Sequence, residues 1–165
     1  MKRLLGLTLA LALTALICVG CAAKAPDLNP ASAYNPALER TIALGMERKT
    51  VEAQIGEPSH TSGVHYTYTG EIVVEYDDRE KVASIMLTQP AASCEWQVMG
   101  GITLSASVDE ILLAYGADAA SWSGDTLFFY FTNDGKACDP LDAAVTCAFN
   151  FFESSLLAIM VKGER

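Results

Sequence analysis

Two segments of the chain repeat the same order of sequence signals, and this internal similarity restricts the fold more than any other feature. Residues 41–58 and 101–118 match in their apolar positions at an offset of 60 residues. In the second segment Ser107 and Glu110 have the spacing of a capping box, and Gly116 can end a helix. Both segments therefore predict a short helix, with the weaker signals in the first.

Runs of β-branched and aromatic residues follow each predicted helix. They lie at 64–69, 71–76 and 82–88 after the first helix, and at 126–132, 147–152 and 156–162 after the second. The polar segments 77–81 and 153–155 separate neighbouring runs, as hairpin loops do. We therefore expect an α+β fold of two tandem repeats, residues 39–90 and 91–165. Each repeat combines a short helix with an antiparallel sheet.

Residues 1–20 have the pattern of an export signal. Two basic residues precede an apolar run, 4–17, which is shorter than the roughly 20 residues that a membrane-spanning helix needs. The run ends in the sequence Ile-Cys-Val-Gly-Cys, which resembles the lipobox of bacterial lipoproteins. This resemblance implies that Cys21 is the lipidated N-terminus of the mature chain. The alternative is an ordinary secretory signal cleaved near Ala22 or Ala23.

The segment after the predicted lipid anchor has the composition of a tether. Residues 22–38 contain three prolines among small and polar residues, without a sustained apolar period. We therefore expect residues 21–38 to form the lipidated cysteine and a flexible linker. Lipidation would hold the protein at the cell membrane or the outer membrane, facing the periplasm or the exterior.

The first predicted helix lies in a sequence that resembles a known lipoprotein family. Gly45 and Met46, followed by Gly56 and Pro58, resemble the opening of the SmpA/OmlA outer-membrane lipoproteins, in which a Gly-Met turn precedes a helix that ends in Gly-x-Pro. The tandem arrangement over residues 41–163 is similar to the β-lactamase-inhibitor-protein fold. These resemblances imply an architecture and not one activity, because related units serve in envelope assembly and in enzyme inhibition. The second segment lacks the Gly-Met pair, which argues against a role in barrel assembly.

Three cysteines remain after Cys21 and the leader are set aside. They can form only one intramolecular disulfide in an exported protein. We favour Cys138 with Cys147, because residues 139–142 are typical of a loop that joins two strands. The alternatives pair Cys94 with Cys138 or with Cys147.

Composition and motifs exclude several functions. The chain has a net charge of −9, which argues against nucleic-acid binding. It contains no GxSxG, HExxH, Walker A or dinucleotide-binding glycine pattern, so we predict that it is not an enzyme and needs no cofactor. His60 and His65 match no two-histidine ligand spacing, and we predict no metal site.

An aromatic strand supplies the candidate binding surface. In the sequence Leu-Phe-Phe-Tyr-Phe at 127–131, alternation places Phe128 and Tyr130 on one face and the other three residues on the opposite face. Either the strand is covered on both sides, or one face is an exposed aromatic surface. The candidate partner-binding residues are Tyr68, Tyr76, Trp96, Phe128 and Tyr130.

These features lead to one functional hypothesis and two alternatives. We expect a non-enzymatic, lipid-anchored envelope protein that binds another envelope or extracellular protein through its sheet face. Its acidic surface favours a basic patch on that partner. The alternatives are an inhibitor of an extracellular hydrolase such as a β-lactamase, and a lipoprotein that binds a small ligand or a metal between sheet and helices.

Overall fold

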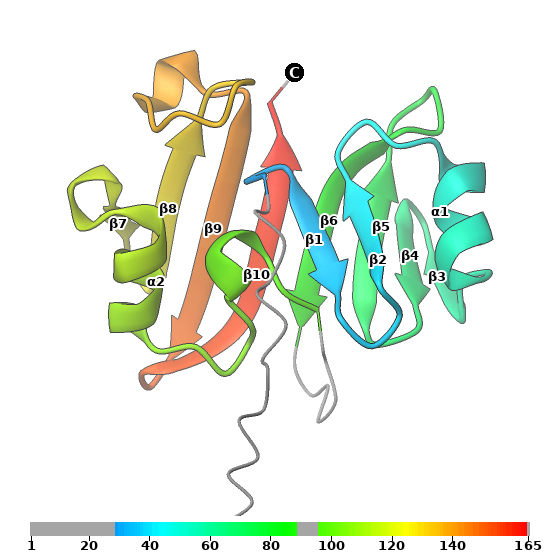
Figure 1. The fold of residues 1–165 in the computed structure, drawn as a ribbon, viewed down its shortest axis with the longest axis horizontal. Helices are drawn as coiled ribbons and strands as arrows, with labels where there is room; N and C mark the ends of the chain where they lie inside the picture. The colour runs from blue at the N-terminus through cyan, green and yellow to red at the C-terminus, as the bar shows by residue number, and fades with distance from the viewer. Residues whose placement is uncertain (1–28, 89–95, 165) are drawn as a thin grey trace, which may run out of the picture.

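The computed structural model describes residues 29–88 and 96–164, and its largest element is one antiparallel sheet of eight strands (Figure 1). The strand order is β3-β4-β5-β6-β10-β9-β8-β7. The first four strands are β3 (His60–Ser62), β4 (His65–Tyr68), β5 (Ile72–Tyr76) and β6 (Val82–Thr88). The other four are β7 (Ser121–Ser123), β8 (Thr126–Phe131), β9 (Val145–Phe152) and β10 (Ser155–Gly163). Strand β10 therefore lies in the middle of the sheet, between β6 and β9.

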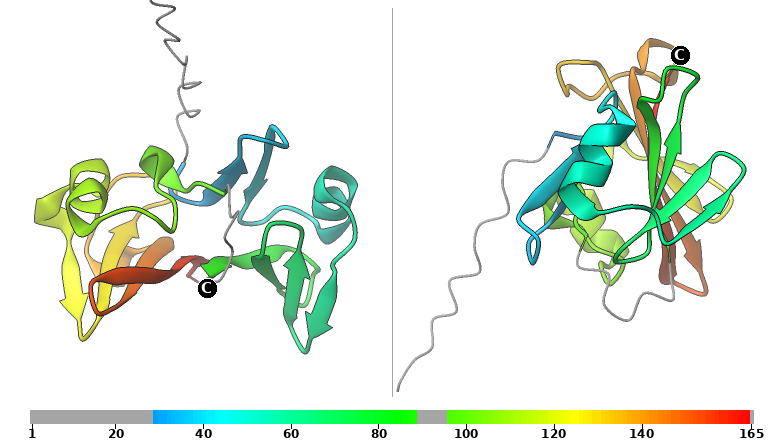
Figure 2. Two further views of the ribbon diagram at one scale, coloured as in Figure 1. Left: turned by 90° about the horizontal axis from the view of Figure 1, so that it is seen from below. Right: turned by 90° about the vertical axis from the view of Figure 1, so that its right-hand side faces the viewer.

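Two helices and a small second sheet lie on one face of the large sheet (Figure 2). They are α1 (Arg48–Ile55), α2 (Val108–Tyr115), and the pair β1 (Ser32–Asn35) and β2 (Arg40–Ala43). Three short 3-10 helices complete the described elements: η1 (Met99–Gly101), η2 (Ala117–Ala119) and η3 (Pro140–Asp142). The opposite face of the sheet carries no helix or second sheet formed by the described residues. We call it the helix-free face.

Local sequence signals explain where α2 begins and where both helices end. The Ser107 hydroxyl accepts a hydrogen bond from the Glu110 backbone amide, and the Glu110 carboxylate accepts one from the Ser107 amide at 2.8 Å. Helix α1 begins after Glu47 without a side-chain cap. Gly56 and Gly116 end the helices with φ values of 87° and 92°, which favour glycine. The two predicted helices are confirmed.

The core lies between the large sheet and the elements that cover it. Val51 and Ile55 of α1 are buried against one half of the sheet, and Ile111 and Tyr115 of α2 are buried against the other. The Tyr115 ring lies 4.8 Å from the ring of Phe129 in β8 and 5.0 Å from that of Phe149 in β9. In β8 the residues on this side, Leu127, Phe129 and Phe131, are apolar and buried, and they alternate with partly exposed residues.

The prediction of two tandem repeats, each with its own sheet, is wrong. Strand β6 pairs directly with β10 in a register that joins Ser84 to Lys162 and Thr88 to Ala158. The strands predicted for residues 39–90 and 91–165 therefore form one continuous sheet, and the fold is mostly β. The repeat signals predict the individual helices and strands, but they do not indicate which strands pair with each other.

Part of the predicted tether is folded. Strand β1 lies within residues 21–38 and pairs with β2. The Tyr34 amide donates to the Gln97 carbonyl at 2.8 Å, and the Gln97 amide donates back at 2.7 Å. This contact fixes β1 to the segment before η1. Cys21, the predicted leader and Cys94 lie outside the described residues.

Candidate functional site

The predicted aromatic strand, β8, has one covered side and one open side. The side that carries α2 buries Leu127, Phe129 and Phe131, so the strand is covered on this side. Phe128 and Tyr130 are partly exposed on the helix-free face. Their rings are stacked at 6.2 Å with an interplanar angle of 7°. Two rigid aromatic groups therefore lie side by side where no described element covers them.

The strand register extends this aromatic pair into an apolar row across the sheet. On the helix-free face, neighbouring strands bring together Val73, Met86, Met160, Ala148 and Phe128, in that order from β5 to β8. All five except Ala148, which is 5% exposed, are partly open to solvent. The row is apolar and contains two methionines, whose flexible side chains adapt to a partner surface. We refer to these five residues as the apolar row.

A polar row lies beside the apolar row, one pleat further along each strand. It runs through His65, Glu75, Ser84, Lys162, Thr146 and Tyr130. His65 Nδ1 lies 3.2 Å from Glu75 Oε1, and the Thr146 hydroxyl donates to Glu164 at 2.8 Å. Lys162 is exposed and forms no ion pair with another described residue. The face therefore combines an apolar centre with one lysine and two carboxylates: Glu75, two strands from Lys162, and Glu164, which holds the Thr146 hydroxyl.

Three predicted binding residues lie away from the helix-free face. Tyr68 is 1% exposed and Trp96 is fully buried, so neither is available to a partner. The indole of Trp96 donates to the Thr69 carbonyl at 3.4 Å. Tyr76 is partly buried on the helix side, where its hydroxyl lies 2.7 Å from the Tyr68 hydroxyl. Burial raises the pKa of both tyrosines. The structure brings together Phe128 and Tyr130 and separates them from the other three.

Tyr76 belongs instead to a cluster around the start of α1. The Arg48 guanidinium lies 4.4 Å from the ring centre of Tyr66 and 5.9 Å from that of Tyr76. Arg48 Nε also donates to Glu52 at 2.7 Å, and this carboxylate raises the pKa of Arg48. A cavity of about 370 Å³ lies beside the two rings. Because the charge of Arg48 is already balanced, we interpret this cluster as structural.

The predicted disulfide between Cys138 and Cys147 is not formed, and both thiols are free. Cys147 is buried on the helix side of β9, where its thiol donates to the Pro30 carbonyl at 3.4 Å. Burial raises the pKa of Cys147 to about 12. Cys138 lies in the loop after β8, and its backbone amide donates to the Tyr130 carbonyl. The two side chains therefore belong to different environments, and the alternative pairings with Cys94 lie outside the described residues.

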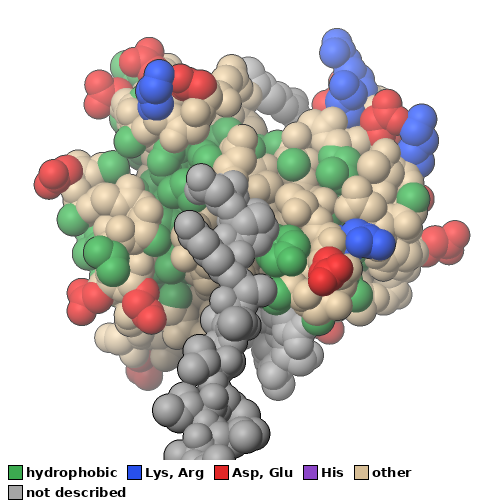
Figure 3. Space-filling model, viewed as in Figure 1, with side chains coloured by type: hydrophobic (Ala, Val, Ile, Leu, Met, Phe, Trp, Pro, Cys, Tyr) green, Lys and Arg blue, Asp and Glu red, His purple; other side chains and the backbone are tan. Residues whose placement is uncertain are grey.

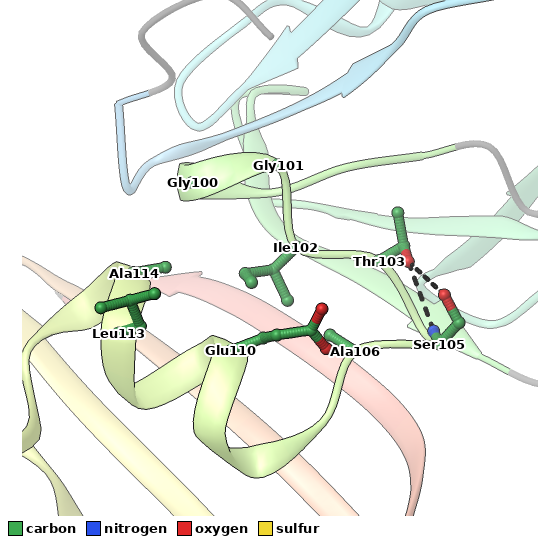
Figure 4. Close-up of a pocket in the computed structure, with 9 residues that line it drawn as sticks. All are labelled: Gly100, Gly101, Ile102, Thr103, Ser105, Ala106, Glu110, Leu113 and Ala114. Atoms are coloured by element: carbon green, nitrogen blue, oxygen red, sulfur yellow. Dashed lines mark hydrogen bonds between the residues drawn. The ribbon is translucent and has the colours of Figure 1, made fainter. Parts of the chain in front are cut away.

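A cavity of about 400 Å³ separates η1 from α2 (Figure 4). Its apolar lining residues are Ile102, Ala106, Leu113 and Ala114, and Glu110 is the one carboxylate that lines it. The cavity thus offers apolar surface, and its one carboxylate, Glu110, is already hydrogen-bonded to Ser107. Among the described residues, no three His, Cys, Asp or Glu side chains could hold a metal ion.

Charge is distributed unevenly between the two halves of the molecule. Figure 3 shows basic side chains over the half that carries α1, whereas acidic side chains dominate the half that carries α2. In residues 96–164 the basic residues are Lys136 and Lys162. Lys136 is paired with Asp134 at 2.6 Å. The helix-free face therefore holds the one cation of this half that has no ion pair among the described residues.

Comparisons with known proteins do not assign a family. No family model matches the sequence, and no curated protein does. A crystal structure of a DUF4309 family protein (YjgB) from Bacillus subtilis matches with a TM-score of 0.45 and 12% identity, over 72% of this chain and 78% of that one. Within the described ranges, none of the helices is both long and apolar enough to cross a bilayer.

Sequence reasoning missed most of the helix-free face. None of the following residues of this face was predicted as a site residue: Val73, Glu75, Met86, Met160 and Lys162. The available signal was alternation, because each of these positions follows a buried apolar residue in its strand. Alternation alone does not say which of the two faces is covered.

Proposed function

We propose that the protein is a non-enzymatic, lipid-anchored component of the cell envelope that binds another envelope or extracellular protein through the helix-free face. The observation that carries this proposal is the stacked pair Phe128 and Tyr130, which ends the apolar row and the polar row on β8. Aromatic residues in a partly exposed apolar patch are typical anchors of protein interfaces. Such a surface requires neither a cofactor nor a catalytic group.

The charge of the molecule supports a partner with a basic patch. The described part of the chain is acidic on both halves, and complementary charge accelerates and orients association. Glu75 lies within the face itself, beside the apolar row. We therefore expect a partner that presents apolar side chains flanked by Lys or Arg.

The experiment that tests this proposal is crosslinking and capture from native envelopes. The wild-type chain is compared with a Phe128→Ala, Tyr130→Ala variant whose fold is verified by circular dichroism and thermal unfolding. Trp122→Ala is the matched control, because Trp122 is 52% exposed but packs against Phe151 on the other side of the sheet. We expect one protein to be captured by the wild type and by the control, but not by the double variant.

Equal capture by all three proteins, or capture of nothing, contradicts binding through the aromatic pair. The identity of the captured protein also tests the alternative function. A captured extracellular hydrolase that loses activity in the complex favours the inhibitor hypothesis over a passive adaptor.

The lipid anchor is tested separately. We expect Cys21→Ala to abolish incorporation of a labelled fatty acid and to release the protein from the membrane fraction, because the multiply acylated cysteine of a lipoprotein is the attachment. Cys94→Ala is the control and should keep the label. An unlabelled wild-type protein contradicts lipidation and favours the ordinary secretory signal.

A further inference from the structure

We infer that the partner anchors on the helix-free face with an arginine side chain, which stacks on the rings of Phe128 and Tyr130 and pairs its charge with Glu164. This inference rests on the proposed function, because it names the group of the partner that occupies the same face. Three observations carry it: the open aromatic pair, the charges around Tyr130, and a cluster of the same groups elsewhere in the molecule.

The aromatic pair presents ring surface to solvent. Phe128 and Tyr130 are both partly exposed, and their rings are parallel within 7°, with centres 6.2 Å apart. No described helix or second sheet lies on this side of β8. The face of an aromatic ring attracts a cation within about 6 Å of its centre, and the planar guanidinium group of arginine also stacks on the ring. The aromatic pair therefore favours arginine over lysine as the anchor.

An unpaired carboxylate lies beside the aromatic pair. Thr146 is the register partner of Tyr130, and its hydroxyl donates to the Glu164 carboxylate at 2.8 Å. Glu164 is exposed and forms no ion pair with another described residue. Its charge is therefore held about one strand away from Tyr130, where a stacked guanidinium can reach it.

The other charges near β8 favour a cation at Tyr130. The Cys138 amide donates to the Tyr130 carbonyl at 3.0 Å. Desolvation and the carboxylates of Asp142 and Asp139 raise the pKa of the Cys138 thiol, so these acidic groups lie near it. Figure 1 shows this loop at the same edge of the sheet as the end of β10. Lys162 lies two strands from Tyr130 and repels a cation from the middle of the polar row.

The same groups already hold an arginine elsewhere in this protein. The Arg48 guanidinium lies 4.4 Å from the ring centre of Tyr66 and 5.9 Å from that of Tyr76, and its Nε donates to Glu52 at 2.7 Å. That cluster combines two neighbouring rings, one carboxylate and one arginine. The aromatic pair on β8 has two rings and a carboxylate, but residues 96–164 contain no arginine. We assign the missing arginine to the partner.

Nuclear magnetic resonance titrations of the full-length chain with a short peptide test the inference. The probe is the acetylated and amidated peptide Leu-Ser-Arg-Ser-Leu, in which alternation places the arginine and both leucines on one side. Two counterparts carry lysine or citrulline, and citrulline keeps the planar shape of arginine without its charge. A cation stacked at an exposed site changes affinity by a factor of about 2 to 5. The ring signals of Phe128 and Tyr130 should therefore report about threefold tighter binding of the arginine peptide than of either counterpart.

Variants of the chain separate the parts of the site. Glu164→Gln should weaken binding of the arginine peptide about threefold, because it removes the charge and still accepts a hydrogen bond from Thr146. Glu153→Gln is the matched control, since Glu153 is exposed in the turn after β9, at the opposite end of that strand from Thr146. Tyr130→Phe keeps a ring and should keep the preference for arginine, whereas Tyr130→Leu should lose it.

A preference for the arginine peptide that depends on Glu164 and on a ring at position 130 supports the inference. Equal binding of the three peptides, or binding of none, overturns it, and so does a preference that Glu164→Gln and Tyr130→Leu leave unchanged. Capture of a protein through Phe128 and Tyr130 without a preference for arginine refutes only the arginine anchor. A preference for arginine without a captured protein supports the anchor and refutes only the proposed envelope partner.

Discussion

Replacement of Tyr115 by phenylalanine removes one oxygen atom from the core beneath α2. Within the described ranges, the Tyr115 hydroxyl is buried and makes no hydrogen bond of regular geometry, and the group that interacts with it is the thiol of Cys147, a weak hydrogen-bonding group. Its ring packs against Phe129 and Phe149, and those contacts do not need the hydroxyl. Burial also raises the pKa of Tyr115 well above its ordinary value, so the group stays neutral.

The expected effect is a gain in stability. A buried hydroxyl without a regular hydrogen bond costs about 1–3 kcal/mol relative to its hydrated state in the unfolded chain. The cavity left by one oxygen atom offsets a few tenths of a kcal/mol of that gain, at about 24 cal/mol per Å³. We therefore expect Tyr115→Phe to raise the free energy of unfolding by about 1 kcal/mol. This corresponds to roughly 4 °C in Tm for a domain of this size.

Urea unfolding followed by the fluorescence of the buried Trp96 measures this difference, with calorimetry as a second readout. Tyr76→Phe is the control with the opposite sign, because it removes the hydroxyl that lies 2.7 Å from the hydroxyl of Tyr68 and leaves that buried group unpaired. We expect this control to lose about 1–2 kcal/mol. A loss of stability in Tyr115→Phe would refute the reasoning and would mean that the thiol of Cys147 is a sufficient partner for the hydroxyl.

Three further predictions concern other groups. In native protein at pH 8, Cys147 should resist alkylation and react only after unfolding, as peptide mass mapping can show, because burial raises its pKa to about 12. The Ser107 backbone amide lowers the pKa of Glu110. The stabilising effect of this carboxylate is therefore present above its ordinary pKa and is lost as pH falls through the lowered value. Glu110→Gln should flatten the dependence of stability on pH in this acid range, as unfolding curves can show. Gly70→Ala should lower Tm, because Gly70 has φ +81° and a Cβ atom there would lie 2.9 Å from Trp96 Nε1; an unchanged Tm would show that the indole moves without cost.

Local elements of the fold were predictable because their signals are contiguous. Helix α2 follows from Ser107, Glu110 and Gly116, and six strands follow from runs of β-branched and aromatic residues. The joining of these strands into one sheet was not predictable in this way. It depends on the pairing of β6 with β10, whose residues Ser84 and Lys162 are far apart in sequence. The short strands β1, β2, β3 and β7 carry too few residues for a clear alternation.

The candidate site was predictable only in part. Alternation correctly placed Phe128 and Tyr130 on one face of β8, since side chains of a strand point to opposite sides. It did not reveal that Tyr68 and Trp96 are buried, because an aromatic residue suits a core as well as a surface. Exposure depends on which face the helices cover. The covered face is determined by the packing of the whole chain and not by the sequence of any one segment.

The central position of β10 makes the order of synthesis important for folding. Until residues 155–163 are in place, β6 and β9 each present a row of unpaired backbone N–H and C=O groups. A truncated chain without β10 has two separate sheet fragments, each with an unpaired edge strand. Such a chain should aggregate instead of folding partially. The complete sheet forms only after the last strand inserts between two earlier ones.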